Sequence, residues 1–110
     1  QISRAGWIGD YVDPNNFLDM FICDGGNNRT GWCNQEYDRL VLDVAPRAKT
    51  HEERMAIFTQ AEQMLMDDLP VLPIYTYTTK HLVHPSVKNI ANNIMDQQSY
   101  REIYLEGAED

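Results

Sequence analysis

Two stretches of helical periodicity, each ended by a proline, constrain the fold of this chain most strongly. The first runs from Asn34 to Pro46, and its apolar residues have the i, i+3, i+4 and i+7 spacing of one helix face: Tyr37, Leu40, Val41 and Val44. The second begins at Thr50, which forms a capping-box pattern with Glu53, and its apolar stripe continues to Pro70. Because proline cannot continue a helical hydrogen-bond ladder, the sequence predicts two adjacent helices.

Segments with the composition of strands flank these helices. Residues 4–8 combine strand formers with small residues, and residues 72–77 alternate and are rich in β-branched and aromatic side chains. Residues 81–84 and 100–105 are shorter candidates. We therefore expect an α+β (mixed α/β) fold in which the two helices pack on a mixed sheet that contains the strands at 4–8 and 72–77.

Composition and charge exclude several classes of function. The formal net charge is −8, and the nine lysines and arginines are scattered, so no basic stripe exists to neutralise a phosphate backbone. We expect no nucleic-acid partner. No nucleophile elbow, glycine-rich phosphate loop or zinc-protease motif is present in the sequence, and we predict that the protein is not an enzyme and needs no cofactor.

The cysteines and histidines raise two further questions of chemistry. Cys23 and Cys33 bracket a loop rich in glycine and asparagine, which is compatible either with a small disulfide or with two buried thiols. His81 and His84 have an HxxH spacing, but three residues apart on a strand they would face opposite sides of it. We therefore expect no metal site.

Asp10 is the carboxylate that the helices do not explain. It directly follows a predicted strand and a glycine, and it stands near Trp7 and Arg4. Local chemistry allows either a turn aspartate or a binding group. A hydrolase that uses Asp10 with Glu36 or Asp13 is disfavoured because the sequence supplies no activated nucleophile or metal set to support it.

Several short motifs occur in one order along most of the chain, up to about Pro85. They are Ser3-Arg4-Ala5-Gly6-Trp7-Ile8-Gly9-Asp10-Tyr11, Asp13-Pro14, Phe17-Leu18, Asn27-Asn28, Asn34-Gln35-Glu36-Tyr37-Asp38-Arg39-Leu40, Glu53-Arg54, Ala61-Glu62 and Leu72-Pro73-Ile74-Tyr75-Thr76-Tyr77. This series resembles the C-terminal region of OppA-like and dipeptide-binding proteins of ABC transporters, which form family 5 of the bacterial extracellular solute-binding proteins.

The resemblance implies a fold and a domain organisation. It implies a fragment of a two-lobed fold like that of type II periplasmic binding proteins. Residues 1–78 would form the C-terminal part of the second ligand-binding lobe, with a hinge at Tyr75, Thr76 and Tyr77. Residues 79–110 would form the return crossing toward the first lobe, which is otherwise absent.

The resemblance also implies roles for four residues. Asp10 would pair with the free α-amino group of a bound peptide, which supplies charge and hydrogen bonds to a carboxylate. The backbones of Trp7 and Ile8 would pair with the peptide main chain. Arg4 matches a place from which an arginine can reach the peptide's carboxylate, and its separation from Asp10, at most roughly 20 Å of strand, would bracket a short peptide.

The function implied is that of the extracytoplasmic substrate-binding component of an ABC importer, which binds short peptides between two lobes. Its partners would be a short peptide, the permease subunits and the remainder of the parent chain, at a periplasmic or extracytoplasmic location, with lipid anchoring of the parent as one option. Two alternatives stay open: a stand-alone acidic protein-interaction module, or the same shell around a non-peptide ligand such as a nickel chelate or haem. Metal-chelate relatives have no need of an anchor for an amino group, so Asp10 discriminates between a peptide ligand and a metal chelate.

Overall fold

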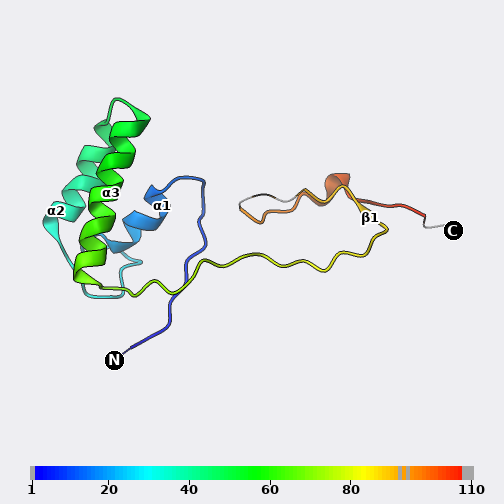
Figure 1. Cartoon of the computed structure of the whole chain (residues 1–110), viewed down its shortest axis with the longest axis horizontal. Coiled ribbons are helices and arrows are strands. Elements are labelled where there is room, and N and C mark those ends of the chain that lie inside the picture. Colours follow the sequence, from blue (N-terminus) through cyan, green and yellow to red (C-terminus); the bar gives the residue numbers. More distant parts are fainter. Residues whose placement is uncertain (1, 92, 94, 108–110) are drawn as a thin grey trace. The chain divides into compact units, whose positions relative to one another are not determined.

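The computed structural model describes residues 2–91, 93 and 95–107. The chain divides into two compact units, Gln1–Pro73 and Ile74–Asp110, which we describe separately. The helices that the sequence predicts lie in the first unit, as the ribbon shows (Figure 1). Parts of the predicted return crossing at residues 79–110 lie outside the described residues.

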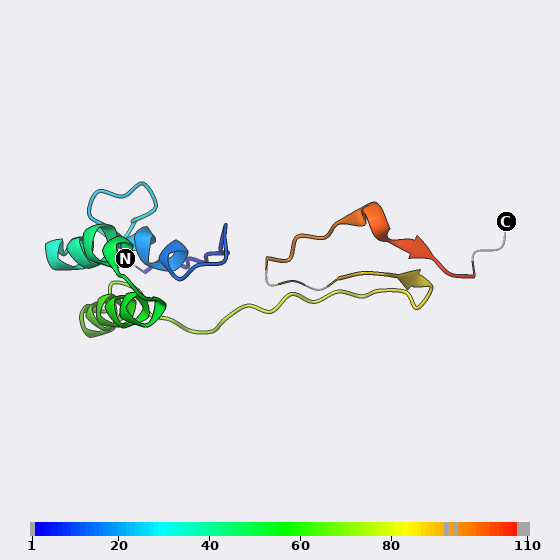
Figure 2. The same ribbon diagram turned by 90° about the horizontal axis from the view of Figure 1, so that it is seen from above.

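The first unit is built from three helical segments. α1 (Asn15–Leu18) continues into a short 3-10 turn, η1 (Asp19–Phe21). α2 (Gln35–Asp38) continues into a π-helical stretch, η2 (Arg39–Val44), and a 3-10 turn, η3 (Ala45–Arg47). α3 (His51–Asp68) is the longest element. Figure 2 shows the loop between η1 and α2 projecting on one side of these helices.

The first predicted helix is confirmed, and its caps explain where it begins and ends. Asn34 is the N-cap, and its side-chain oxygen accepts from the backbone N–H groups of Glu36 and Tyr37 at 3.0 and 3.2 Å. The helix then widens, so that the N–H of Ala45 reaches back five residues to the carbonyl of Leu40. Pro46 lies in the closing 3-10 turn, where a residue without an N–H is tolerated.

The second predicted helix, α3, is also confirmed. The hydroxyl of Thr50 accepts from the N–H of Glu53 at 3.1 Å, while the Glu53 carboxylate accepts from the N–H of Lys49 at 2.8 Å. Leu69 ends the helix in a left-handed conformation with φ 46°, directly before Pro70. Within the part of the chain that the structure describes, no helix combines the length and apolarity needed to cross a membrane.

The hydrophobic core is formed where the second helical segment packs along α3 (Figure 1). Tyr37 is fully buried, its ring meets Trp32 edge-on at 5.0 Å between centroids, and its hydroxyl donates to the backbone carbonyl of Leu18. Burial raises the pKa of the Tyr37 hydroxyl well above its ordinary value, so it stays a donor. The buried apolar members of this core are Leu18, Tyr37, Leu40, Val41, Ala45, Ile57, Phe58, Ala61 and Leu65.

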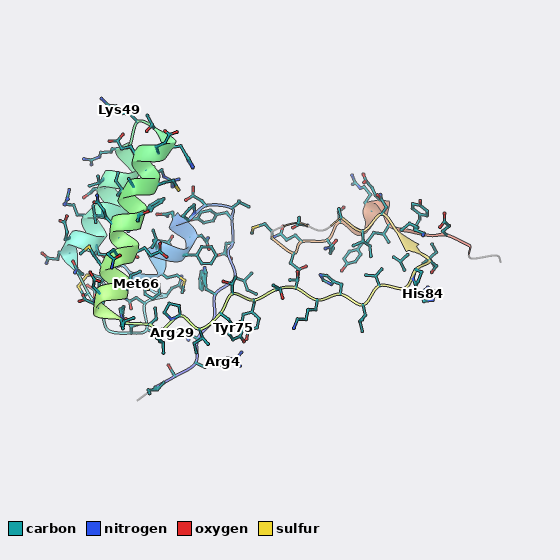
Figure 3. All side chains as sticks on the ribbon, in the orientation of Figure 1. Arg4, Arg29, Lys49, Met66, Tyr75 and His84 are labelled. Carbon is teal, nitrogen blue, oxygen red and sulfur yellow. A yellow bond between two sulfur atoms is a disulfide. The ribbon has the colours of Figure 1, made fainter. Side chains whose placement is uncertain are left out.

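The second unit has little regular structure among its described residues. β1 (Val87–Lys88) pairs antiparallel with β2 (Tyr104–Leu105), Val87 opposite Leu105, and η4 (Tyr100–Glu102) is a 3-10 turn. An ion pair between Lys88 and Glu106, at 3.0 Å, supports the pairing. Figure 3 shows the chain running extended between the labelled Tyr75 and His84.

Helices with a small sheet agree with an α+β class, but the predicted packing on a mixed sheet is wrong. Residues 4–8, 72–77 and 81–84 are not strands in the structure, and of residues 100–105 only Tyr104 and Leu105 are. The observed sheet is a two-stranded antiparallel pair. The physical reason is that alternation specifies an extended backbone, whereas a strand exists only when a neighbouring backbone pairs with its N–H and C=O groups.

Candidate ligand-binding site

A single buried asparagine side chain organises the segment that contains Trp7 and Asp10. The Oδ1 atom of Asn16 accepts a hydrogen bond from the indole Nε1–H of Trp7 at 2.8 Å. The same oxygen accepts from the backbone N–H of Asp10 at 3.1 Å. Asn16 is 2 % exposed, so the acceptor side of both hydrogen bonds is shielded from competing water. The structure thus brings together two of the predicted site residues, through a third that the sequence did not indicate.

Asn16 reaches this position because α1 begins directly after the Asp13-Pro14 turn. The Asp13 carboxylate accepts from the backbone N–H of Asn15 at 2.8 Å, and Pro14 has the helical φ that precedes the first turn. Gly9 lies against the ring of Phe17, so closely that an added Cβ would be 3.3 Å from the ring's Cζ atom. The residue before Asp10 is therefore best filled by glycine.

An ion pair between Asp13 and Arg54 ties this loop to the first turns of α3. The guanidinium donates to both carboxylate oxygens, at 2.7 and 2.9 Å, and it lies 4.6 Å from the centroid of the Phe58 ring. The hydrogen bonds from Arg54 hold the pKa of the Asp13 carboxyl below its usual range. Both side chains are less than a third exposed, so the pair is a fixed part of the unit and not a free surface contact.

The carboxylate of Asp10 lies in an exposed, acidic region. Asp10 is exposed, and within residues 2–91, 93 and 95–107 its side chain has no ion-pair partner. Burial, opposed by a 3.5 Å hydrogen bond from the Tyr11 hydroxyl and reinforced by the negative charge of Asp10, raises the pKa of the nearby Asp19. A cation would meet a favourable field here.

The other predicted contact residues have less structure around them. Ile8 has an 80 % exposed side chain, and Arg4 is exposed; neither belongs to a strand. The predicted hinge residues, Tyr75, Thr76 and Tyr77, are exposed in the second unit, where the two tyrosine rings lie 4.8 Å apart between centroids. The proposed contacts of Arg4 and Ile8 and the proposed hinge remain predictions.

The two cysteines are joined by a disulfide, with their Cα atoms 4.6 Å apart (Figure 3). The loop that it closes is organised by Asn28, whose Nδ2 group donates to the carbonyls of Phe21, Ile22 and Trp32 at 2.8 to 3.2 Å. Both carboxylate oxygens of Asp38 accept from the backbone N–H of Cys23. These bonds hold the loop against α2, without involving Trp7 or Asp10.

The histidines of the HxxH pattern bind neighbouring side chains. The Nε2 atom of His81 lies 2.9 Å from a carboxylate oxygen of Asp96, and the Nδ1 atom of His84 lies 2.8 Å from the Ser86 hydroxyl. Among the described residues, no group of three or more histidine, cysteine or acidic side chains could hold a metal ion.

Sequence reasoning missed Asn16 and the function of Arg54. The dense turn chemistry of Asp13-Pro14-Asn15-Asn16 indicated a loop, and Arg54 was recognised only as part of a motif. Asparagine is more often exposed than buried, so only a fold can show which one accepts two hydrogen bonds. An asparagine one turn after an aspartate-proline pair, near a tryptophan, is the signal that was available.

Comparison with known proteins reveals clear relatives, although no family model matches the chain. The dipeptide-binding protein DppE of Bacillus subtilis is 37 % identical over 93 residues, which are 84 % of this chain and 17 % of that protein. The oligopeptide-binding protein OppA of the same organism is 36 % identical over 106 residues, 96 % of this chain and 19 % of that protein. The periplasmic murein peptide-binding protein MppA of Escherichia coli is 34 % identical over 105 residues, 94 % and 19 % respectively.

These relatives define a class of peptide-binding proteins. The chain belongs to the family of ABC-transporter peptide-binding proteins that contains them, family 5 of the bacterial extracellular solute-binding proteins. It spans about a fifth of the length of the relatives it matches. The resemblance in the motifs is thus confirmed by the alignment of most of the chain.

Proposed function

We propose that the protein containing this chain is the extracytoplasmic substrate-binding component of an ABC importer, which binds short peptides and delivers them to the membrane permease. The observation that carries the proposal is the similarity of most of the chain to proteins named for binding dipeptides, oligopeptides and murein peptides. MppA and the OppA proteins of Salmonella typhimurium and Haemophilus influenzae are named as periplasmic, which supports an extracytoplasmic location.

Within this function, Asp10 is the anchor for the α-amino group of the peptide. Its exposed carboxylate lies in a region of negative charge, and the backbone N–H of Asp10 itself is held by the side chain of Asn16. An ammonium group would gain charge-assisted hydrogen bonds there. Trp7 and Ile8 offer backbone groups to the peptide main chain, and Arg4 offers a cation to its carboxylate.

The remaining assignments follow the family. Residues 1–78 belong to the second lobe of a two-lobed fold, and residues 79–110 return toward the first lobe. Tyr75, Thr76 and Tyr77 act at the hinge, where an extended segment absorbs changes in backbone angles. The partners are a short peptide, the permease subunits and the rest of the same protein.

The test is the response of Asp10→Asn to the charge of the peptide's amino terminus, measured by calorimetry on the whole protein. A charge-assisted hydrogen bond contributes roughly 1.5 to 3 kcal/mol, so the affinity for tri-alanine should fall by about ten- to a hundred-fold. N-acetyl-tri-alanine has no ammonium group; it should bind the unaltered protein weakly and lose little more in the variant. The pair of ligands therefore acts as a double-mutant cycle.

Asp24→Asn is the matched control, because Asp24 is an exposed aspartate of the disulfide loop with a left-handed φ of 56°, which asparagine tolerates. It changes the net charge equally and should leave both affinities unchanged. Equal losses for the free and acetylated peptides in Asp10→Asn would show that Asp10 is a turn residue. Failure of the unaltered protein to bind any free peptide would favour the interaction module or a non-peptide ligand.

A further inference from the structure

We propose that Asn16 is a positioning residue, which makes selectivity for a free amino terminus depend on one buried amide oxygen. This inference rests on the proposed peptide-binding function and deepens it. Its basis is that Oδ1 of Asn16 accepts from both Trp7 and the backbone of Asp10, at 2.8 and 3.1 Å. One oxygen atom therefore links the indole ring of Trp7 to the backbone of Asp10, and both residues would contact the ligand.

The segment from Ala5 to Gly9 gives Asn16 its importance. Among the described residues, this segment belongs to no helix or strand, so no ladder of backbone bonds holds it. The two bonds to Asn16 hold it, one at Trp7 in its middle and one at Asp10, directly after its end. A carbonyl oxygen has two lone pairs, and both are used here. Loss of this acceptor would release both residues together.

Asn16 is itself held on both sides. Asp13, three residues earlier, is fixed by the paired hydrogen bonds from Arg54 of α3. Leu18, two residues later, lies in the core, and its carbonyl accepts from the hydroxyl of Tyr37. The acceptor oxygen thus stands on a turn of helix that is attached to both long helical segments of the unit. Such a support keeps the ligand-contacting groups in one geometry before the ligand arrives.

The side-chain amide of Asn16 is neutral, which suits its position close to acidic side chains. Burial, to which the charge of Asp10 adds, raises the pKa of the neighbouring Asp19, so a further anion in this region would be unfavourable. A neutral oxygen accepts the two hydrogen bonds without adding to that repulsion. Leucine has nearly the same shape without the acceptor, and aspartate keeps the acceptor with a charge, so these two variants separate shape from hydrogen bonding.

The experiment compares Asn16→Leu with Asn16→Asp in the whole protein, with tri-alanine and N-acetyl-tri-alanine as probes. In Asn16→Leu the ratio of the two affinities should fall by about ten-fold, because Asp10 is no longer held for the ammonium. Asn16→Asp keeps the acceptor but adds the unfavourable charge, so it should recover only part of this ratio. The indole N–H resonance of Trp7, assigned with Trp7→Phe, should move in Asn16→Leu.

Asn28→Leu is the matched control, since Asn28 is a partly buried asparagine that organises the disulfide loop through three hydrogen bonds. It should lower the stability but leave the affinity ratio and the Trp7 resonance unchanged. Hydrogen exchange in the unaltered protein gives a second measurement, in case Asn16→Leu does not fold. The Trp7 indole N–H and the Asp10 amide should both exchange slowly.

The outcomes separate this inference from the function on which it rests. If the unaltered protein prefers tri-alanine and Asn16→Leu keeps the full preference, the positioning function is overturned and the proposed function stands. Free exchange of either the indole N–H or the Asp10 amide overturns it as well. If the unaltered protein binds neither peptide, the proposed function itself fails.

Discussion

The two units of the chain use their apolar residues in opposite ways. Every buried apolar residue among the described residues lies between Leu18 and Leu65, in the first unit. In the second unit, Ile74, Tyr75 and Leu82 are 82, 64 and 107 % exposed. A helix satisfies its backbone hydrogen bonds within itself, so it can pack an apolar face directly against a neighbouring helix. The backbone N–H and C=O groups of an extended segment need another backbone as partner before the segment can be buried.

The long-range bonds differ in the same way. In the first unit, Arg54 binds Asp13 across 41 positions of sequence, and the indole of Trp32 donates to Asp68 across 36. In the second unit, among the residues that the structure describes, Lys88 forms an ion pair with Glu106 and His81 lies 2.9 Å from Asp96, across only 18 and 15 positions of sequence. The comparison teaches that side-chain bonds to a helix can stabilise a loop that has no strand partner.

The largest expected effect on the free energy of unfolding is the loss of a buried tyrosine, which we compare with the loss of an exposed one in the 110-residue chain. Tyr37→Ala removes a fully buried ring and should cost about 3 to 5 kcal/mol. Tyr75→Ala removes an exposed ring and should change the stability by about 0.5 kcal/mol or less. Amide exchange of α3, as a function of urea, measures both. Equal losses would show that the two units share one core.

Removal of the disulfide should have an intermediate effect that stays within the first unit. The chain-entropy model gives about 2 to 3 kcal/mol for a loop with a sequence separation of 10. Replacing both Cys23 and Cys33 by serine should therefore speed the exchange of α2 and α3 amides. The amides of β1 and β2 serve as the internal control, and faster exchange there would break the distinction between the units.

The smallest effect concerns the ion pairs and depends on pH. Because Arg54 lowers the pKa of Asp13, the pair stabilises the folded state at neutral pH, and this contribution is lost as the pH falls below about 4, the ordinary carboxyl range. Asp13→Asn should cost about 1 kcal/mol at pH 7, discounted for partial exposure, and little at pH 3. Urea denaturation at both values measures it.

Lys88→Met is the control for this prediction, because it removes an exposed ion pair of the second unit. Its expected cost is about 0.5 kcal/mol or less, at either pH. A loss in Asp13→Asn that persists unchanged at pH 3 would mean that Asp13 acts through its bond to the Asn15 backbone, and not through the charge of Arg54.

The helices could be predicted because their determinants are local. Asn34 and Thr50 cap, the apolar spacing defines a face, and Pro46 and Pro70 mark the ends, all within a few residues of one another. The motif series was sufficient to recognise the family. The π-helical widening before Pro46 was not predictable, since a stretch of 6 residues is too short for its own period to show in the apolar pattern.

The strands and the support of the site depended on groups far apart in the sequence. Residues 4–8 and 72–77 have strand composition, but no strand forms there, because pairing needs a second backbone that composition does not specify. The sequence singled out Asp10 and Trp7 as candidates. It did not indicate that Asn16 would hold both of them, nor that Arg54 would hold Asp13 from α3.

The sequence by itself therefore determined the two long helical segments, their boundaries and the family, since each depends on a local pattern or on an ordered series of motifs. The tertiary structure decided which polar side chains are buried and what they bind. That decision depends on distances between residues up to 41 positions apart, which arise only when the helices pack. A buried hydrogen-bond acceptor such as Asn16 has no local pattern, because its partners become neighbours only in the folded chain.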